Sequence, residues 1–151
     1  MHHPRLVGGL AALAVLLTLT VAPVAVAATA NPRPVNARAA TIAKRYLGVP
    51  YVFGGASPSG FDASGLTRFV FGQLGVKLPH GATDQQRLSK RVSLAKLRRG
   101  DLVFWGSASY SYLVGIYAGH QRVILAAHTG SSVDCQSISG AWTGGRLLPL
   151  R

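Results

Sequence analysis

Residues 50–66 read PYVFGGASPSGFDASGL, and they combine turn-forming residues with the start of a helical pattern. Its first part, residues 51–55, is a short extended run that ends in two glycines. Residues 56–60 are rich in Ser, Pro and Gly, which favour turns. Asp62 or Ala63 then begins a helix with one apolar face, because apolar residues recur at i, i+3, i+4 and i+8. These residues are Leu66, Phe69, Val70 and Leu74. The stretch therefore predicts a glycine turn that leads into the N-terminus of a half-buried helix.

Helical patterns come first along the chain, and strand patterns follow. Residues 37–47 have helical spacing with a basic outer face, and Thr83–Leu88 forms a brief helix capped by Thr83 or Asp84. After Gly100 and Asp101 the period changes to that of strands. Strands are expected at 102–105, 112–118, 122–126, 131–135 and 146–150, with a turn at 119–121. This order predicts an α+β domain whose N-terminal helices pack on an antiparallel β-sheet.

Four segments in this order resemble the NlpC family of bacterial cell-wall cysteine peptidases. They are PYVFGG and FDASGL within 50–66, Leu78-Pro79-His80, Arg99-Gly100-Asp101-Leu102-Val103-Phe104-Trp105, and Val114-Gly115-Ile116-Tyr117-Ala118-Gly119. The resemblance covers residues 37–151 and implies a papain-like fold. Members of this family cut peptidoglycan stem peptides, commonly between D-glutamate and diaminopimelate. That chemistry needs a thiolate at a helix N-terminus, a histidine that activates it, and a polar residue that orients the histidine.

The resemblance places apolar residues at all three catalytic positions. Ala63 stands where the family has its cysteine, and Leu113 stands where it has its histidine. Leu125, twelve positions later, stands where the orienting residue lies. A methyl group cannot attack a carbonyl, and an isobutyl group cannot carry a proton. We therefore expect an inactive relative of the family; the alternative is a substituted or inactivated form of a D-glutamyl-diaminopimelate endopeptidase.

The residues that recognise the ligand look better preserved. Tyr51 matches a family tyrosine near the bound peptide, and Asp62 and Ser64 flank the lost cysteine, where the stem peptide's amino group can bind. His80 occupies a position where the family often has a basic residue on the groove wall. Helix capping by Asp62 and core packing by Tyr51 and Phe53 are the structural alternatives. We expect Tyr51, Asp62, Ser64 and His80 to bind stem peptides.

The N-terminus has the pattern of a secretory leader. Arg5 precedes an uncharged apolar run, and small residues follow it up to Ala30, so we interpret 1–30 as a signal peptide and 31–36 as a linker. Leu10 to Leu19 is short for a spanning helix, which makes a retained membrane anchor the weaker alternative. We expect a secreted protein of the cell wall or periplasm, with no stable membrane span once the leader is removed.

The net charge and the single cysteine indicate which binding partners and which disulfides can be expected. The chain has 16 Lys and Arg against 4 Asp and no Glu, a net charge of +12. Such a surface attracts anionic wall polymers, whereas no nucleic-acid motif and no paired-Cys zinc pattern occurs. We expect no nucleic-acid partner, no metal and no cofactor. The single cysteine, Cys135, excludes an internal disulfide and is interpreted as a small half-buried hydrophobic residue.

Overall fold

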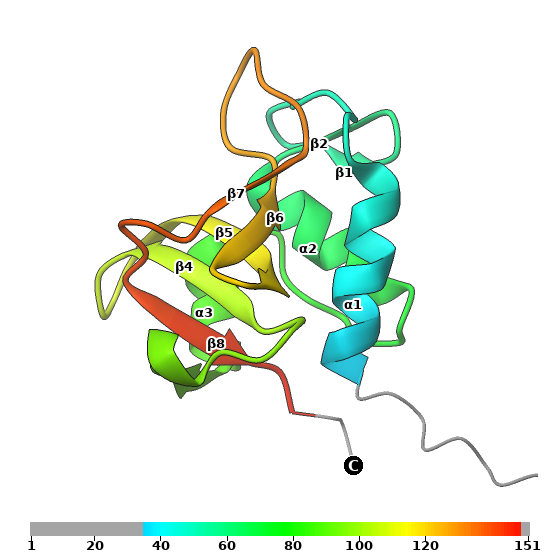
Figure 1. The fold of residues 1–151 in the computed structure, drawn as a ribbon. Coiled ribbons are helices and arrows are strands. Elements are labelled where there is room, and N and C mark those ends of the chain that lie inside the picture. The colour runs from blue at the N-terminus through cyan, green and yellow to red at the C-terminus, as the bar shows by residue number, and fades with distance from the viewer. Residues whose placement is uncertain (1–34, 149–151) are drawn as a thin grey trace, which may run out of the picture. The chain divides into compact units, whose positions relative to one another are not determined.

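The structure is a computed structural model that describes residues 35–148 (Figure 1). The predicted signal peptide at 1–30 lies outside the described residues, as do most of the predicted linker and residues 149–151. In the part of the chain that is described, no helix combines the length and the apolar character needed to cross a membrane.

Within residues 35–148, three α-helices precede the main sheet. They are α1 (Val35–Ala43), which continues into the 3-10 helix η1 (Lys44–Tyr46), then α2 (Ala63–Gly72) and α3 (Ala82–Leu88). Helix α1 begins two residues earlier than expected, so residues 35 and 36 belong to the helix. The predicted cap of α3 is wrong, because Gly81 is its N-cap. The Thr83 hydroxyl instead bonds to the backbone of Ser111, both as donor to the carbonyl and as acceptor from the N–H, at 3.1 Å.

Eight strands follow the pattern of an antiparallel α+β domain, as predicted. Strands β1 (Ala56–Ser57) and β2 (Gly60–Phe61) form a small hairpin before α2. The other six form one sheet in the order β3-β8-β4-β5-β6-β7, and all its pairs are antiparallel. Their bounds are β3 Lys90–Val92, 3-10 helix η2 Leu94–Lys96 after it, β4 Leu102–Gly106, β5 Ser111–Gly119, β6 Arg122–Leu125, β7 Asp134–Ser137 and β8 Thr143–Arg146. The helices pack on this sheet (Figure 1).

The ends of the sheet differ from the sequence prediction. Strand β3 was not expected, β7 lies about three residues later than 131–135, and β8 ends where the predicted strand 146–150 begins. Close approach of neighbouring groups explains the position of β8. A Cβ on Gly144 would lie 2.4 Å from Leu97 Cδ2, and one on Gly145 would lie 2.1 Å from Ser89 Oγ. Strand β8 therefore runs where only glycine fits.

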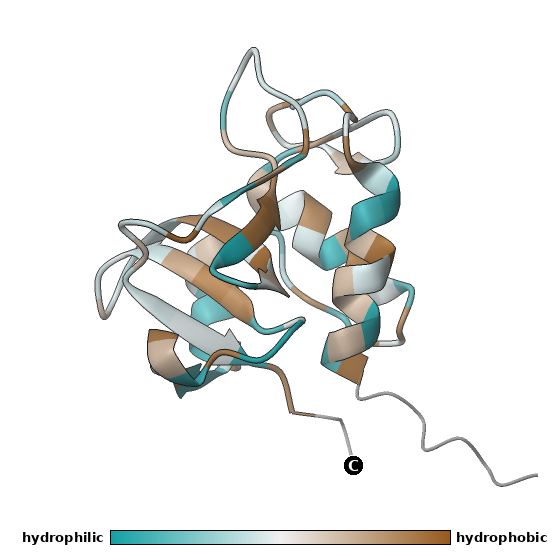
Figure 2. Ribbon diagram, viewed as in Figure 1, coloured by the Kyte–Doolittle hydropathy of each residue, from teal (hydrophilic) through white to brown (hydrophobic). Residues whose placement is uncertain are grey.

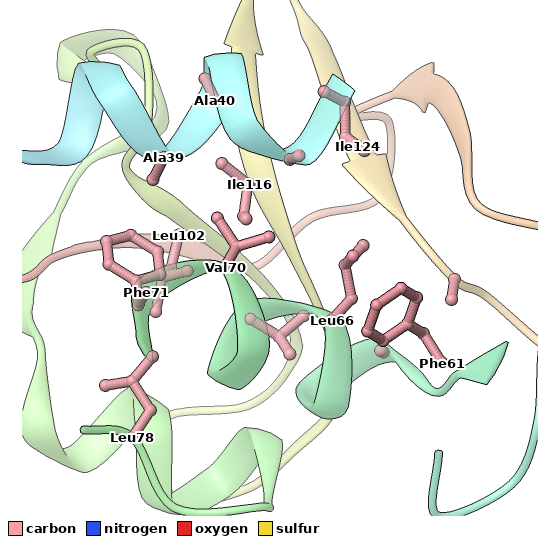
Figure 3. Packing of buried hydrophobic residues seen from close by; sticks show 14 of the residues in the cluster. Ala39, Ala40, Phe61, Leu66, Val70, Phe71, Leu78, Leu102, Ile116 and Ile124 are labelled. Carbon is pink, nitrogen blue, oxygen red and sulfur yellow. The ribbon is translucent and has the colours of Figure 1, made fainter. Parts of the chain in front are cut away.

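The core lies on both faces of the sheet. On one face, α1 and α2 cover alternate residues of the central strands, and Figure 3 shows Leu66 and Val70 of α2 together with Ile116 of β5 in this cluster. The other face has a smaller cluster around Val103, Tyr117 and Leu125. Because side chains alternate between the faces of a strand, the central strands need apolar residues in succession. Figure 2 shows this concentration of hydrophobic residues on the central strands and on the helices.

A buried carboxylate before β4 binds the end of β8 and the start of α1. Asp101 is fully buried and accepts bonds from Arg146 Nε at 2.9 Å and Nη2 at 2.6 Å. It also accepts from the backbone N–H of Arg98 at 2.7 Å and from Asn36 Nδ2 at 3.4 Å. The hydrogen bond to Asp101 raises the pKa of the Arg146 guanidinium, and burial partly opposes that rise. The turn that the sequence predicts at 100–101 is thus also the attachment point of α1 and β8.

Candidate functional site

The site is built on the N-terminus of α2. Asp62 is the N-cap, and its Oδ1 accepts the N–H of Gly65 at 2.7 Å, which confirms the capping role. Its Oδ2 accepts the N–H of Gly54 at 3.0 Å, so the same side chain holds the glycine turn against the helix. A Cβ on Gly65 would lie 1.9 Å from the carbonyl oxygen of Gly55. The helix therefore starts in direct backbone contact with the turn.

Two of the predicted ligand-binding residues meet at Asp62. His80 Nε2 lies 2.9 Å from Asp62 Oδ1 and 3.0 Å from Oδ2, and the pair is an ion pair whenever His80 is protonated. The Ser64 hydroxyl donates to Asp62 Oδ1 at 3.3 Å. The carboxylate thus lies between the serine and the histidine. A hydrolytic triad needs the histidine in the middle, where it can accept the serine proton.

A hollow of about 220 Å³ opens at this helix end, and we call it the α2 groove. Its lining residues come from the glycine turn, the starts of α2 and α3, β5 with the residue before it, and the segment after β6. They are Tyr51, Phe53, Asp62, Ala63, Ser64, Ala82, Tyr110, Ser111, Tyr112, Leu113 and Ala127. Asp62 is the one carboxylate among them, and neither a cysteine nor a histidine belongs to this lining.

Two of the three positions that the resemblance assigns to catalysis line the groove, and the third shares a hydrophobic cluster with one of them. Ala63 is the first residue of α2, it is 9% exposed, and it lines the groove together with Leu113 from β5. Leu125 on β6 is 1% exposed and belongs to the cluster on the second face of the sheet. Leu113 packs against that cluster and also against the main core. Ala63 and Leu113 therefore contribute only hydrocarbon to the lining of the groove.

The aromatic residues divide between core and rim. Tyr51 packs against the main core, as its structural alternative predicted; it also lines the groove, and its contact with a stem peptide stays a prediction. Phe53 is 89% exposed, which makes the core-packing alternative wrong for this residue. Tyr110 and Tyr112, which were not predicted from the sequence, are also exposed and line the groove. The sequence pattern that could have indicated them is a pair of tyrosines two positions apart, one just before β5 and one within it, because such a spacing favours the same face of a strand.

A buried amide fixes the frame of the groove. Gln85 on α3 is fully buried, and its Nε2 donates to the carbonyls of Ser64 at 3.0 Å and Pro79 at 2.8 Å. Its Oε1 accepts from the Thr67 hydroxyl at 2.6 Å. One side chain therefore ties α2 to the segment that carries His80. No sequence pattern points to this role, since Gln85 lies in a short helix with the composition of a surface helix.

Other nucleophiles and bases lie away from the groove lining. Cys135 is half-buried on β7 and packs against the main core, in agreement with its interpretation as a small hydrophobic residue. His128 is exposed, with its Nδ1 2.9 Å from the carbonyl oxygen of Thr129. His120 lies in the β5–β6 turn, where it has a positive φ of 52°. Over residues 35–148, no group of three or more His, Cys, Asp or Glu side chains could hold a metal ion.

Comparison with known proteins agrees with this geometry. Residues 48–150 match the model of the NlpC/P60 family. The probable endopeptidase p60 of Listeria grayi is 41% identical over 92 residues, which cover 61% of this chain and 18% of that protein. The chain thus spans about a fifth of the length of the curated relatives it matches.

Solved structures extend the match to three dimensions. The NlpC/p60 domain of the peptidoglycan hydrolase SagA is 35% identical, with a TM-score of 0.71 over 74% of this chain and 98% of that chain. RipD from Mycobacterium tuberculosis, described as a non-catalytic NlpC/p60 domain protein adapted to peptidoglycan binding, has the same fold. It is 23% identical, with a TM-score of 0.66 over 77% of this chain and 99% of that chain. With a family match over most of its length and the same α+β fold, this chain belongs to the NlpC/P60 family.

Proposed function

We propose that this chain is a non-hydrolysing NlpC/P60 domain that binds peptidoglycan stem peptides. The observation that carries the proposal is the pair Ala63 and Leu113, which line the α2 groove where the family chemistry needs a thiol and an imidazole. Leu125, buried behind Leu113, provides no polar group to orient a base. Replacing a complete polar network by apolar groups is energetically acceptable, whereas a single replacement leaves an unpaired buried partner.

Neighbouring residues offer no substitute for the missing centre. Ser64 donates its hydroxyl proton to Asp62, and a carboxylate held by a helix cap and by His80 is a weak base for a serine. His80 faces the carboxylate and makes no hydrogen bond to Ser64 among the bonds found in residues 35–148. Hydrolysis needs a nucleophile and a base within hydrogen-bond reach of each other.

The same groove is suited to hold a peptide. Asp62 keeps 17% of its side chain exposed and is the lining carboxylate, so it can accept the amino group of a stem peptide. Ser64, beside it, donates to Asp62 and can still accept a hydrogen bond from a peptide N–H. Tyr51, Phe53 and the two strand tyrosines supply rigid apolar walls, which bind ligands at low cost in side-chain entropy. RipD supports the proposal at the level of the fold, because its description pairs this fold with peptidoglycan binding without catalysis.

We further infer that the domain acts outside the cytoplasm, in the cell wall or periplasm, after the leader 1–30 is removed. The substrates cut by family relatives and the leader pattern support this location. The net charge of +12 favours additional attraction to anionic wall polymers and does not require a nucleic-acid partner.

Hydrolysis is tested with a D-glutamyl-diaminopimelyl stem peptide. We expect no new amine above a no-protein control after prolonged incubation with purified protein, detected by amine labelling and mass spectrometry. Release of the amine, and its loss in Ser64→Ala or Cys135→Ala, would show a displaced nucleophile and overturn the proposal.

Binding is tested by calorimetry with the same peptide. We expect saturable binding that Asp62→Asn weakens about tenfold or more, since hydrogen bonds to charged groups contribute about 1.5–3 kcal/mol. Asparagine can still cap α2, so the fold is preserved. Lys77→Ala, an exposed residue away from the groove, is the control and should bind as the wild type does. Absence of binding by the wild-type protein at low salt would contradict the proposal.

A further inference from the structure

A second hollow, unrelated to the α2 groove, lies at the edge of the sheet. It has a volume of about 730 Å³ and is formed by β3, the 3-10 helix η2 after it, and the end of β8. We call it the β3 groove. Five of its eight lining residues are cationic: Lys90, Arg91, Lys96, Arg98 and Arg146. From Gln85 to Gly100 the sequence contains no acidic residue.

One of these cations is neutralised, and it forms a rigid part of the wall. Arg146 makes two hydrogen bonds to the buried Asp101, at 2.9 Å and 2.6 Å, and keeps 24% of its side chain exposed. The other four are exposed, and none of them forms an ion pair with a carboxylate within residues 35–148. The groove thus concentrates four uncompensated positive charges around a fifth that is held in place.

The arrangement of these charges is unfavourable for the fold. Lys90 on β3 lies directly opposite Arg146 on β8 in the antiparallel register. Like charges in directly opposite positions destabilise a strand pair, and Asp101 compensates only the Arg146 side. Clusters of like charge repel one another, and an anionic ligand would relieve that repulsion.

The positive surface extends beyond the groove. A neighbouring hollow of about 240 Å³ shares Arg91 with it and adds Arg87 from the end of α3, which pairs with Asp84 at 3.2 Å. Arg91 also lies over the ring of Trp142, with its Cζ 5.3 Å from the ring centroid. Because the two hollows share Arg91, they form one cationic path along β3. A repeating anion fits such a path better than an isolated one.

We propose that the β3 groove binds a phosphodiester-linked glycopolymer of the cell envelope. Arginine and lysine are the side chains that bind phosphate, and arginine does so with two parallel hydrogen bonds. Single-stranded nucleic acid fits less well, because it needs exposed aromatic rings for base stacking. The lining residues of the two hollows include no aromatic ring, and the adjacent Trp142, which is 44% exposed, already has Arg91 over its ring. The assignment to the envelope rests on the proposed function, whereas the groove itself does not.

The two grooves can be occupied together. The α2 groove and the β3 groove share no lining residue. Helix α3 lies between them in sequence, with Ala82 lining the α2 groove and Arg87 lining the hollow next to β3. A domain with both sites would hold a stem peptide and an anionic polymer of the same wall at once.

The test is binding of fluorescently labelled poly(glycerol phosphate) to the full chain, followed by anisotropy at several salt concentrations. We expect the logarithm of the affinity to fall linearly with the logarithm of salt concentration. The triple variant Lys90→Ser, Lys96→Ser, Arg98→Ser should lose about tenfold or more in affinity and show a shallower salt slope. The control triple Lys44→Ser, Arg45→Ser, Lys77→Ser removes the same charge from other exposed positions and should lose less than about threefold.

Several results would overturn the inference. Equal losses in the two triple variants would show diffuse attraction without a site. Tighter binding of a single-stranded oligonucleotide of equal charge would assign the groove to nucleic acid, and equal binding of poly-γ-glutamate would remove the preference for phosphate. Urea unfolding checks the fold, and we expect the groove triple to be at least as stable as the wild type. Asp62→Asn should leave polymer binding unchanged, so failure of stem-peptide binding and failure of the β3 groove are separable.

Discussion

The α2 groove and the β3 groove differ in the side chains that line them: apolar residues at the centre of the first, and cations along the second. In the α2 groove, Ala63 and Leu113 present hydrocarbon at the positions to which the sequence resemblance assigns the family's thiol and imidazole. In the β3 groove, four exposed cations remain without acidic partners, at a cost to the fold. Under the proposed function, the loss of reactive groups in the α2 groove is therefore not a loss of function throughout the domain.

The largest effect should come from rebuilding the centre of the α2 groove. The triple variant Ala63→Cys, Leu113→His, Leu125→His places a thiol at a helix N-terminus, a base beside it and an orienting group behind the base. We expect stem-peptide cleavage about 10³-fold or more above that of any single variant, because the residues of such a centre act as a unit. Amine release is the measurement. Measurable turnover by Ala63→Cys alone would contradict the assignment of Leu113.

A smaller but still large effect concerns the wall of the β3 groove. Asp101→Ala should lower the free energy of unfolding by about 3 kcal/mol or more, because it leaves Arg146 without its carboxylate. Urea unfolding followed by circular dichroism measures this change. Asp84→Ala is the control: its pair with Arg87 is exposed, so we expect a loss of at most about 1 kcal/mol. Equal losses would mean that burial of Asp101 has no special role.

The cap of α2 should separate stability from recognition. Asp62→Ala should cost about 1 kcal/mol, because the N–H of Gly65 loses its acceptor, whereas Asp62→Asn should cost less. Both variants should bind stem peptide weakly, since both remove the charge. Thermal unfolding and calorimetry of the two variants decide the matter. If Asp62→Asn bound peptide as well as the wild type does, Asp62 would be a capping residue alone.

The smallest effect is expected at the rim. Phe53 is 89% exposed, so Phe53→Ala should change the free energy of unfolding by less than about 0.5 kcal/mol. Stem-peptide affinity should still fall a few-fold if the ring forms part of the binding wall, as the proposed function requires. Calorimetry beside Leu88→Ala, another exposed apolar residue, provides the comparison. An unchanged affinity would remove Phe53 from the site.

The central part of the fold was predictable because several local signals agreed there. The start of α2 combines a capping residue, helical apolar spacing and a preceding glycine turn, and Asp62 is its cap. The turn after β5 was also predicted, and His120 and Gln121 adopt the positive φ of 52° and 58° that a tight hairpin turn needs. Each of these features depends on neighbours in sequence.

The edges of the sheet depend on distant neighbours, and there prediction failed. Strand β3 is three residues long and carries two cations, so it lacks a strand signal of its own. Strand β8 contains two glycines, which disfavour strands in general, yet Leu97 and Ser89 leave no room for a side chain there. The same limit applies to the α2 groove: the residues around Asp62 could be named from sequence, whereas Tyr110, Tyr112 and Gln85 reach the site only through folding.

The buried amide of Gln85 has a consequence for how the α2 groove opens. Because one side chain binds the carbonyls of Ser64 and Pro79, the start of α2 and the segment before α3 cannot separate without exposing an amide that has lost its partners. Local opening of this region is therefore expected to be rare, and the backbone amides on both sides should exchange hydrogen slowly and together. A groove held in this way is preorganised. A peptide that enters it orders little of the protein, so more of the contact energy remains as affinity.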